Sequence, residues 1–335
     1  MSVFASLAGV VDETLDRAVV PGYSRLGYAL RRRTWPGDDP APNALAARTV
    51  LVTGAGSGIG LATCRAFAEL GATVLAVGRD PDRGEQAAAQ VAVDVPDADI
   101  RFERCDVSNL AEVRAFGADL CRRHDRLDVV VHNAGVLPPR RTESDQGHEV
   151  TLATHVLGPI LLTESLLPLF EQAAPARVVV VSSGGAYTTR LHVEDLEYRT
   201  GRYLGANAYA RTKRMQIALT PVLDRRWSSY GARAYSMHPG WADTPGVADS
   251  LPFFRRLTGA LLRDAEQAAD TVVWLAATAT PPPGGTFWHD RRIRPTHYLP
   301  QTRETAAEIE ALWQFCCNAT EIARSSRASN KEESE

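Results

Sequence analysis

The sequence has few cysteines, no long apolar run and little excess charge of either sign. Its five cysteines show neither the paired spacing of a zinc site nor that of a disulfide framework, so we expect no metal centre and reduced thiols in a cytoplasmic protein. No apolar run approaches the roughly 20 residues of a membrane span, and the opening Met-Ser-Val-Phe lacks the basic and apolar regions of a signal peptide. A net charge of −3 excludes the strong basic field that nucleic-acid binding would need.

Lysine is almost absent: it occurs at positions 213 and 331, and arginine supplies the rest of the 37 basic side chains. Lys213 follows Tyr209 by four residues, a spacing that places both on one face of a helix. The compact ammonium differs from the wide arginine fork, so its retention here indicates a specific need for it. A fixed ammonium lowers the pKa of a phenol from about 10, which predicts a tyrosine general acid/base. The pair could also be a coincidence, because the chain has nine tyrosines.

Strand-like and helical segments alternate from residue 48 onward, which is typical of a parallel sheet covered by helices on both faces. We predict a doubly wound, Rossmann-type α/β domain of about seven strands at 46–300, a helical arm at 1–45, a C-terminal helix at 301–323 and a disordered tail at 324–335. The strands are expected at 49–52, 73–77, 100–104, 127–132, 177–182, 233–236 and 286–288, and the main helices at 59–70, 108–123, 146–171, 207–229 and 264–278.

The N-terminal arm begins with an apolar segment of helical spacing, which Pro21-Gly22 is expected to end, and a second short apolar segment follows. The second ends in the basic run at 31–33. We expect the arm to pack on the main domain. The alternative is contact with a partner or with an anionic membrane surface through that basic run.

A glycine-rich turn at 53–60, Thr-Gly-Ala-Gly-Ser-Gly-Ile-Gly, follows the first strand and opens the first helix. Glycines let the backbone turn tightly and approach a pyrophosphate, which the helix N-terminus then binds through its free N–H groups and its dipole. The position between strand and helix therefore predicts dinucleotide binding. The candidate contacts are Gly54, Ser57, Gly58, Ile59 and Gly60.

The end of the second strand indicates which dinucleotide is bound. Arg79 comes first there and Asp80 follows. An arginine pairs with a ribose 2′-phosphate, whereas a carboxylate bonds the 2′-hydroxyl and repels the phosphate. The order favours NADP, with NAD as the alternative. In another interpretation Arg79 is a solvated loop residue and Asp80 caps the next helix.

Further motifs follow in a fixed order: CDV at 105–107, HNAG at 132–135, VSS at 181–183, YARTK at 209–213 and HPGWADT at 238–244. Together with the glycine-rich turn, they make residues 48–290 resemble the short-chain dehydrogenase/reductase superfamily. Within it, the string SMHPGWADTPGV at 236–247 and the N-terminal arm resemble the dehydrogenase/reductase family member 12 group.

The resemblance implies further cofactor contacts. Asp106 and Val107 would contact the adenine, and Asn133, Ala134 and Gly135 would line the cofactor behind the fourth strand. The alternative for Asn133 is a simple turn residue at a strand end.

The last motif supplies three more cofactor contacts by resemblance: Pro239, Gly240 and Thr244, of which Thr244 would hold the nicotinamide carboxamide. The segment 244–262 is rich in leucine and phenylalanine. It is expected either to cover a substrate and exclude water, or to form a core or subunit contact. Its apolar character favours a lipophilic substrate.

The same resemblance assigns the chemistry to Ser183, Tyr209 and Lys213. Tyr209 would exchange a proton with the substrate oxygen as hydride moves to or from the nicotinamide, and Ser183 would hydrogen-bond that oxygen. Lys213 would bond the nicotinamide ribose and lower the Tyr209 pKa. Ser182 is the alternative serine. Because the helix that bears this tyrosine packs between subunits in many relatives, a homodimer or homotetramer is expected.

Two features depart from the family pattern. The segment 184–206 lengthens the gap between Ser183 and Tyr209 and is expected to wall the substrate pocket, unless it is a surface excursion. His155 occupies the position of the family's fourth catalytic residue, an asparagine that holds a water beside the lysine largely through its main-chain carbonyl. His155 could preserve that relay and add a group titrating near neutral pH, or be a packed helix residue that impairs turnover.

These observations predict an NAD(P)-dependent oxidoreductase, with NADP favoured, that interconverts a lipophilic alcohol and its ketone or aldehyde. The alternative is a cofactor-binding sensor or scaffold of the same fold with weak or no turnover, which His155 and the long insertion would favour.

Overall fold

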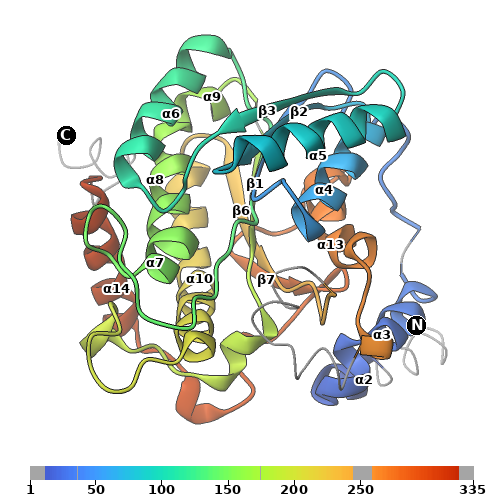
Figure 1. Ribbon diagram of the computed structural model, residues 1–335. Coiled ribbons are helices and arrows are strands. Elements are labelled where there is room, and N and C mark those ends of the chain that lie inside the picture. Colours follow the sequence, from blue (N-terminus) through green and yellow to red (C-terminus); the bar gives the residue numbers. More distant parts are fainter. Residues whose placement is uncertain (1–11, 36, 174, 244–258, 324–335) are drawn as a thin grey trace, which may run out of the picture.

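The computed structural model describes residues 12–35, 37–173, 175–243 and 259–323, which form one sheet covered by helices on both faces (Figure 1). The strand order is β3-β2-β1-β4-β5-β6-β7-β8. All neighbours pair in parallel except β7 and β8, which form an antiparallel hairpin. The strands are β1 (Thr49–Thr53), β2 (Thr73–Gly78), β3 (Asp99–Arg104), β4 (Val129–His132), β5 (Ala176–Val181), β6 (Ala232–Met237), β7 (Thr286–His289) and β8 (Arg292–Ile293).

The predicted doubly wound sheet is confirmed, with β8 as an unpredicted short addition. The central strands β4 and β5 are buried along their whole length, as their valine-rich sequences require. In β1, Leu51 belongs to the core on one face of the sheet, while Val50 and Val52 belong to the core on the other. The chain passes from β3 back across to β4, beside β1, and this reversal leaves a crevice at the carboxyl ends of the strands.

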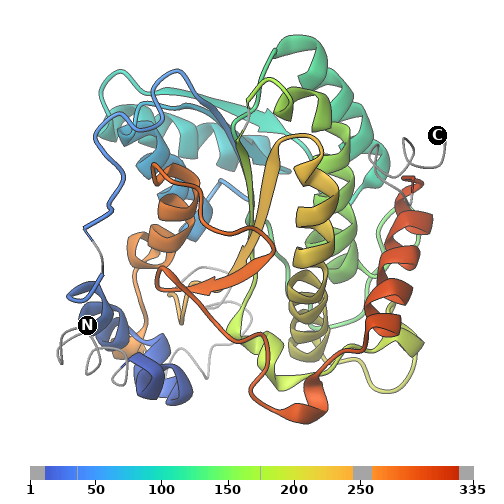
Figure 2. The ribbon, with the colours of Figure 1, turned by 180° about the vertical axis from the view of Figure 1, so that it is seen from behind.

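Helices α4, α5 and α13 cover one face of the sheet, and α6, α8 and α10 cover the other (Figures 1 and 2). Side-chain caps begin several of them: Asp80 caps α5, Asn109 caps α6 and Asp264 caps α13. The helices are α2 (Val19–Tyr23), α3 (Arg25–Arg32), α4 (Gly58–Glu69), α5 (Pro81–Asp94), α6 (Leu110–Arg123), α7 (Val150–Leu152), α8 (Gly158–Ser165), α9 (Leu167–Phe170), α10 (Gly205–Ser228), α13 (Ala265–Ala277) and α14 (Ala306–Thr320).

The single helix expected at 146–171 is instead divided into α7, a π-helical turn η1 (Ala153–Leu157), α8 and α9. Gly158 lies where η1 ends and α8 begins. Only glycine fits at this position, because a Cβ would lie 1.9 Å from the carbonyl oxygen of Val107. Hydrophobic periodicity cannot reveal such a division, since all five residues of η1 are buried. Wide turns of this kind are frequent at functional sites.

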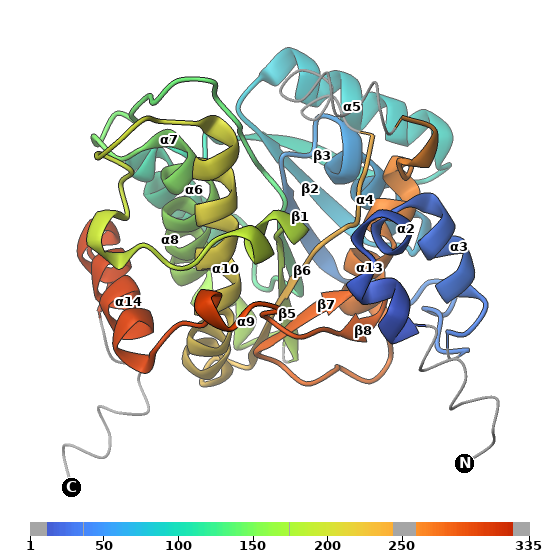
Figure 3. The same ribbon diagram turned by 90° about the horizontal axis from the view of Figure 1, so that it is seen from below.

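The two ends of the described chain pack on opposite sides of the domain (Figure 3). The arm helices α2 and α3 lie near α13 and the β7–β8 hairpin, while α14 lies against α8 and α10. Pro21-Gly22 was expected to end the first helix, but the interruption falls at Ala18 and both residues lie within α2. Pro21 is tolerated there because the first turn of a helix has no internal acceptor for its missing N–H.

Candidate active site

A cavity of about 1020 Å³ lies at the carboxyl ends of the strands. This volume is at the upper end of the roughly 300–1,000 Å³ typical of small-molecule sites, so it has room for a cofactor and a substrate together. Its lining comes from the loops after β1 to β6 and from the first turns of α10.

The glycine-rich turn forms one end of this cavity through Gly54, Gly56, Ser57, Gly58 and Ile59, whereas Gly60 packs behind the turn and does not line the cavity. Gly54 has φ +68°, and a Cβ there would lie 2.7 Å from Ala134 Cα. A Cβ at Gly60 would lie 2.2 Å from the Gly54 carbonyl oxygen. Both positions therefore require glycine, and α4 begins at Gly58 with its N-terminus facing the cavity, where Ser57 and Ile59 also lie. This cradle fits a dinucleotide pyrophosphate.

Asn133 holds this turn in place. Its Nδ2 donates to the carbonyl oxygens of Thr53 at 3.1 Å and Gly54 at 3.2 Å, and its main-chain N–H donates to Thr53 Oγ1 at 3.1 Å. Asn133 therefore ties the end of β4 to the end of β1 and is more than a turn residue. Its neighbours Ala134 and Gly135 line the cavity beside it.

Arg79 and Arg83 both line the cavity after β2. Asp80 caps α5 by accepting a hydrogen bond from the Arg83 main-chain N–H at 3.1 Å, so the capping interpretation is confirmed. Arg83 was not predicted. It lies in the first turn of α5. Its side chain packs against Gly56, where a Cβ would lie 3.2 Å from Arg83 Cγ. Among the described residues neither guanidinium has an ion-pair partner.

The remaining predicted cofactor residues lie along the same cavity, with one exception. Asp106 and Val107 line it after β3, and Pro239 and Gly240 line it after β6. Asp106 Oδ1 accepts two hydrogen bonds from Ser108, which fixes its side chain at the end of the strand. Thr244 lies outside the described residues, as does most of the apolar segment 244–262.

Ser183, Tyr209 and Lys213 all line this cavity. The Lys213 Nζ lies 5.3 Å from the Tyr209 ring centroid and donates to the carbonyl oxygen of Val181, at the end of β5, at 2.7 Å. The Tyr209 hydroxyl lies near the Ser183 side chain, which acts to lower the pKa of the phenol. The lysine is 2% exposed, so its ammonium points into the site and not into bulk solvent.

Burial dominates the electrostatics of this group. It lowers the pKa of Lys213 to about 7. It also raises the pKa of Tyr209, while the nearby Ser183 side chain acts in the opposite direction. The net pKa of Tyr209 is therefore raised in this structure, and not lowered as we expected from Lys213, because burial is the larger influence.

Of the two serines at the end of β5, Ser183 is the one that faces the Tyr209 hydroxyl. Ser182 is buried, and its Oγ donates to the main-chain carbonyl of Lys213 at 3.0 Å. Ser183 begins η2 (Gly184–Thr188), where its Oγ accepts from the Gly185 N–H at 3.1 Å and leaves the hydroxyl proton free to act in the cavity.

His155 lies behind the cavity wall and is not among its lining residues. Its Nε2 accepts from the Val136 N–H at 3.0 Å, and its Nδ1 lies 2.8 Å from Thr212 Oγ1. The Thr212 hydroxyl donates to the Tyr209 carbonyl at 2.9 Å, so Nδ1 is the donor and the imidazole is neutral. The main-chain carbonyl of His155 accepts from Gln216 Nε2 at 2.7 Å.

This arrangement overturns the expectation that His155 titrates near neutral pH. Burial, followed by the charge of Lys213, lowers its pKa well below the ordinary value. His155 instead ties the loop after β4 to the helix that carries Tyr209 and Lys213.

The comparisons with known proteins agree with this geometry. The family model for short chain dehydrogenases matches residues 48–252. The chain belongs to the short-chain dehydrogenase/reductase family. It is an oxidoreductase of the kind that uses a nicotinamide cofactor and a small-molecule substrate.

Two relatives and two solved structures illustrate the similarity. The Bos taurus dehydrogenase/reductase SDR family member 12 is 38% identical over 295 residues, 87% of this chain and 91% of the relative, which confirms the predicted resemblance to this group. The Homo sapiens retinol dehydrogenase 12 is 31% identical, over 82% of this chain and 86% of the relative. A crystal structure from Mycobacterium paratuberculosis has a TM-score of 0.67 with 28% identity, over 87% of this chain and 99% of its own. A candidate NAD(P)-dependent gluconate 5-dehydrogenase from Beutenbergia cavernae, with NADP bound at low occupancy, has a TM-score of 0.61 with 25% identity, over 74% of this chain and 96% of its own.

In this family member the insertion at 184–206 contributes to the cavity mainly through its ends, at Gly185, Thr188 and Ala206. Polar residues between them tie the insertion to the neighbouring segment at 148–149. The Tyr203 hydroxyl donates to Glu149 Oε1 at 2.9 Å, and the Glu149 N–H donates to Glu197 Oε2 at 2.8 Å. No local motif marked the other lining residues, because they come from separate loops and helices. They are Leu137, Pro138, Thr142, Val150, Thr154 and Asn207.

Proposed function

We propose that the protein is an NADP-dependent dehydrogenase/reductase that interconverts a lipophilic alcohol and its ketone or aldehyde. The observation that carries this proposal is the meeting of Ser183, Tyr209 and Lys213 in one cavity with the glycine-rich turn. A scaffold without turnover would have no need to bury a lone lysine behind a tyrosine.

The residues have distinct roles in the proposed reaction. The nicotinamide supplies or accepts the hydride. Tyr209 transfers a proton to or from the substrate oxygen, and Ser183 hydrogen-bonds that oxygen as negative charge develops on it. Lys213, which donates to the Val181 carbonyl, has further protons for the hydroxyls of the nicotinamide ribose. His155 keeps the backbone at Val136 and the helix at Thr212 in register without exchanging a proton.

The lining of the substrate side supports a lipophilic substrate. Leu137, Pro138 and Val150 contribute apolar lining between β4 and η1, and Trp241 and Ala242 contribute more after β6. Apolar walls with a few polar groups near the reacting oxygen select substrates by shape and hydrophobicity. The similarity to a retinol dehydrogenase points in the same direction.

Two arginines support NADP over NAD. Arg79 and Arg83 lie on the adenosine side without ion-pair partners among the described residues, and Asp80 is occupied as a helix cap. Guanidinium groups bind phosphate oxygens through several donors. Replacement of both arginines by alanine is expected to raise the Kd of NADPH by about tenfold or more while changing that of NADH little. Equal weakening of the two nucleotides would contradict the NADP preference.

The reaction is tested by replacement of the tyrosine. NADPH oxidation is measured with a series of lipophilic ketones and aldehydes, and Tyr209→Phe is expected to lower kcat by about 10²-fold or more, with NADPH binding retained. Tyr235→Phe is the matched control, because its hydroxyl bonds the Pro282 carbonyl away from the cavity. Bound NADPH without turnover of any carbonyl by the wild-type protein would instead favour the sensor or scaffold.

The homodimer or homotetramer was expected to pair through α10, the helix that bears Tyr209, and the structure bears on that interface. Helix α14 covers the outer side of α8 and α10 with four buried apolar residues, Leu312, Trp313, Cys316 and Cys317. Pairing of subunits through α10 would have to displace this helix, so we propose that any oligomer uses another face.

None of the helices in the described part of the chain has the length and apolar character needed to cross a bilayer. The cytoplasmic location stays a proposal from the sequence. The alternative of membrane-surface contact depended on the three arginines at 31–33. Arg31 cannot contribute to such a contact, because it is buried in ion pairs.

A further inference from the structure

The N-terminal arm reaches the cofactor cavity from behind. The loop after β6, residues 238–242, lines the cavity through Pro239, Gly240, Trp241 and Ala242, and we name it the β6 loop. On its other side lies the end of α2. A Cβ at Gly240, whose φ is +79°, would lie 2.7 Å from the Tyr23 carbonyl oxygen and 2.5 Å from Arg263 Nε. No side chain fits between the arm and the β6 loop at this point.

Three consecutive carbonyl oxygens of the arm accept hydrogen bonds at this contact. The Trp241 N–H donates to the Tyr23 carbonyl at 2.8 Å. Arg263 donates to the Gly22 and Ser24 carbonyls, both at 3.3 Å, and to the Pro239 carbonyl, also at 3.3 Å. One buried guanidinium therefore joins the arm to the β6 loop. The main chain of Arg263 adds to this join, because its N–H donates to the Trp241 carbonyl at 2.7 Å.

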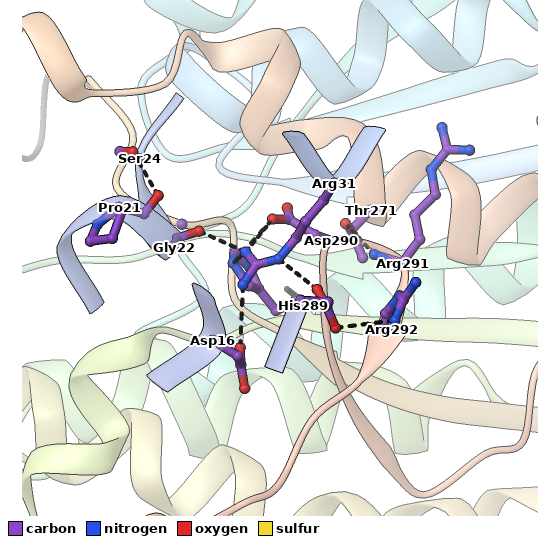
Figure 4. Close-up of polar contacts among 12 residues, drawn as sticks. Asp16, Pro21, Gly22, Ser24, Arg31, Thr271, His289, Asp290, Arg291 and Arg292 are labelled. Atoms are coloured by element: carbon purple, nitrogen blue, oxygen red, sulfur yellow. Dashed lines mark hydrogen bonds and ion pairs between the residues drawn. The ribbon is translucent and has the colours of Figure 1, made fainter. Parts of the chain in front are cut away.

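A buried ionic cluster holds this contact in place (Figure 4). Asp290 binds Arg263 through both carboxylate oxygens, at 2.6 and 2.9 Å, and binds Arg31 of α3 at 2.8 Å. Arg31 also donates to the Gly22 carbonyl at 2.6 Å and to Asp12 at 2.8 Å. Asp290 thus links both arginines, and it is 1% exposed.

The turn that carries Asp290 has an unusual backbone conformation. Asp290 and Arg291 join β7 to β8 and have φ +50° and +56°, a conformation that usually requires Asn or Gly. Both side chains are engaged: Asp290 binds Arg31 and Arg263, and Arg291 binds Asp270 at 2.8 Å. Such unfavourable backbone conformations are retained where the surrounding structure stabilises them. They are often found at functional sites.

The Tyr23 ring extends the contact to the residue after Ser183. A Cβ at Gly184 would lie 3.0 Å from Tyr23 Cε2, and the Tyr23 ring packs edge-on against His238, with centroids 4.5 Å apart. The ring thus lies between Gly184, the residue after Ser183, and His238 at the start of the β6 loop. Its hydroxyl has no hydrogen-bond partner among the described residues, so the ring and the main chain make the contact.

We propose that Tyr23, Arg263 and Asp290 are positioning residues for the nicotinamide end of the cofactor site, and that the N-terminal arm supports this end of the site from behind the β6 loop. Docking of the arm fixes the path of Pro239 to Trp241, whose backbone must face the cofactor. This inference rests on the proposed use of a nicotinamide cofactor, but it does not depend on which carbonyl is reduced.

The test measures cofactor affinity without turnover. The Kd of NADPH, or of NADH if wild type binds it more tightly, is determined from nucleotide fluorescence, alongside stability in urea. Asp290→Asn keeps the shape and tolerates the positive φ but removes the charge between Arg31 and Arg263. We expect the Kd to rise by about tenfold.

Asp128→Asn is the matched control, because Asp128 is 4% exposed and binds Arg48 and Arg126 at the opposite end of the sheet. It should lose stability but keep the Kd within about twofold. A second pair covers the case in which Asp290→Asn does not fold: Tyr23→Ala should weaken binding, and Tyr23→Phe should restore it.

The outcomes separate this inference from the proposed function. Folded Asp290→Asn and Tyr23→Ala proteins that bind the nucleotide as tightly as wild type would overturn the positioning role. A loss of affinity in Asp128→Asn equal to that in Asp290→Asn would also overturn it, by showing a general effect of stability. Wild-type protein that binds neither nucleotide would overturn both the inference and the proposed function.

Discussion

The N-terminal arm buries three carboxylates and three guanidiniums beside the cofactor cavity, whereas α14 buries leucine, tryptophan and cysteine side chains against α8 and α10. The arm contributes Asp12, Asp16 and Arg31, which meet Arg263, Asp290 and Arg294 of the main domain. Helix α14 contributes an apolar face, and Trp313 lies under the Arg226 guanidinium, 5.5 Å from it.

The two kinds of contact impose different constraints. An apolar face stabilises in rough proportion to the area that it buries, and it tolerates small shifts. Buried ion pairs stabilise only in a geometry that satisfies each charged group, so they fix orientation more strictly. Ion pairs of the arm therefore suit the proposed role of fixing the backbone of the β6 loop. The apolar face of α14 suits the less strict role of covering α8 and α10.

The largest expected effect is on the arm. Asp12→Asn leaves Arg31 and Arg294 partly unpaired in a buried place, so we expect a loss of about 4 kcal/mol in the free energy of unfolding. Glu13→Gln is the matched control, because Glu13 forms an exposed pair with Arg17 and should cost less than about 0.5 kcal/mol. Urea unfolding measures both. Similar losses in the two variants would remove the distinction between buried and exposed charge in the arm.

A smaller effect is expected from α14. Leu312 is fully buried, and Leu312→Ala should cost about 3 kcal/mol through lost burial and a residual cavity. The Kd of the nicotinamide nucleotide should stay unchanged, since α14 does not line the cavity. Ala311→Ser on the exposed side of the same helix is the control, with a change below about 0.5 kcal/mol expected. A clear change in nucleotide affinity for Leu312→Ala would show that α14 also shapes the site.

The smallest effect is a selective weakening of the arm in acid. Burial alone would raise the pKa of Asp12, but Arg294, Arg292 and Arg31 hold it below the ordinary value. A carboxyl with a lower pKa in the folded state contributes stability above its unfolded pKa of about 3.9 and loses it as pH falls through the folded value. We therefore expect the arm to be unchanged between about pH 5 and 7 and to weaken below about pH 4.

Hydrogen exchange of 12–35 and 306–320, corrected for the intrinsic pH dependence, measures this difference. The buried face of α14 carries no carboxylate, so its protection should fall less than that of the arm. Equal loss of protection in both segments would indicate global unfolding and would contradict the comparison.

Much of the candidate site could be predicted because its signals are local. The glycine positions at 54–60 lie between a β-branched strand and a helix, and Tyr209 and Lys213 share one helix face through their spacing alone. Arg83 was missed, although it follows the cap residue Asp80 by one helical turn and could have been placed on the cavity side from that cap. The raised pKa of Tyr209 and the neutral state of His155 depend on burial, which sequence spacing does not report.

The sequence by itself determined the alternation of strands and helices, the dinucleotide turn and the tyrosine–lysine pair, because each depends on neighbours within a few residues along the chain. The tertiary structure alone decided that Arg31 and Tyr23 lie behind the β6 loop, that α7, η1 and α8 divide one apolar stretch, and that α14 covers α10. Contacts such as Arg31 to Asp290 join residues 259 positions apart, and only the folded sheet brings such groups together.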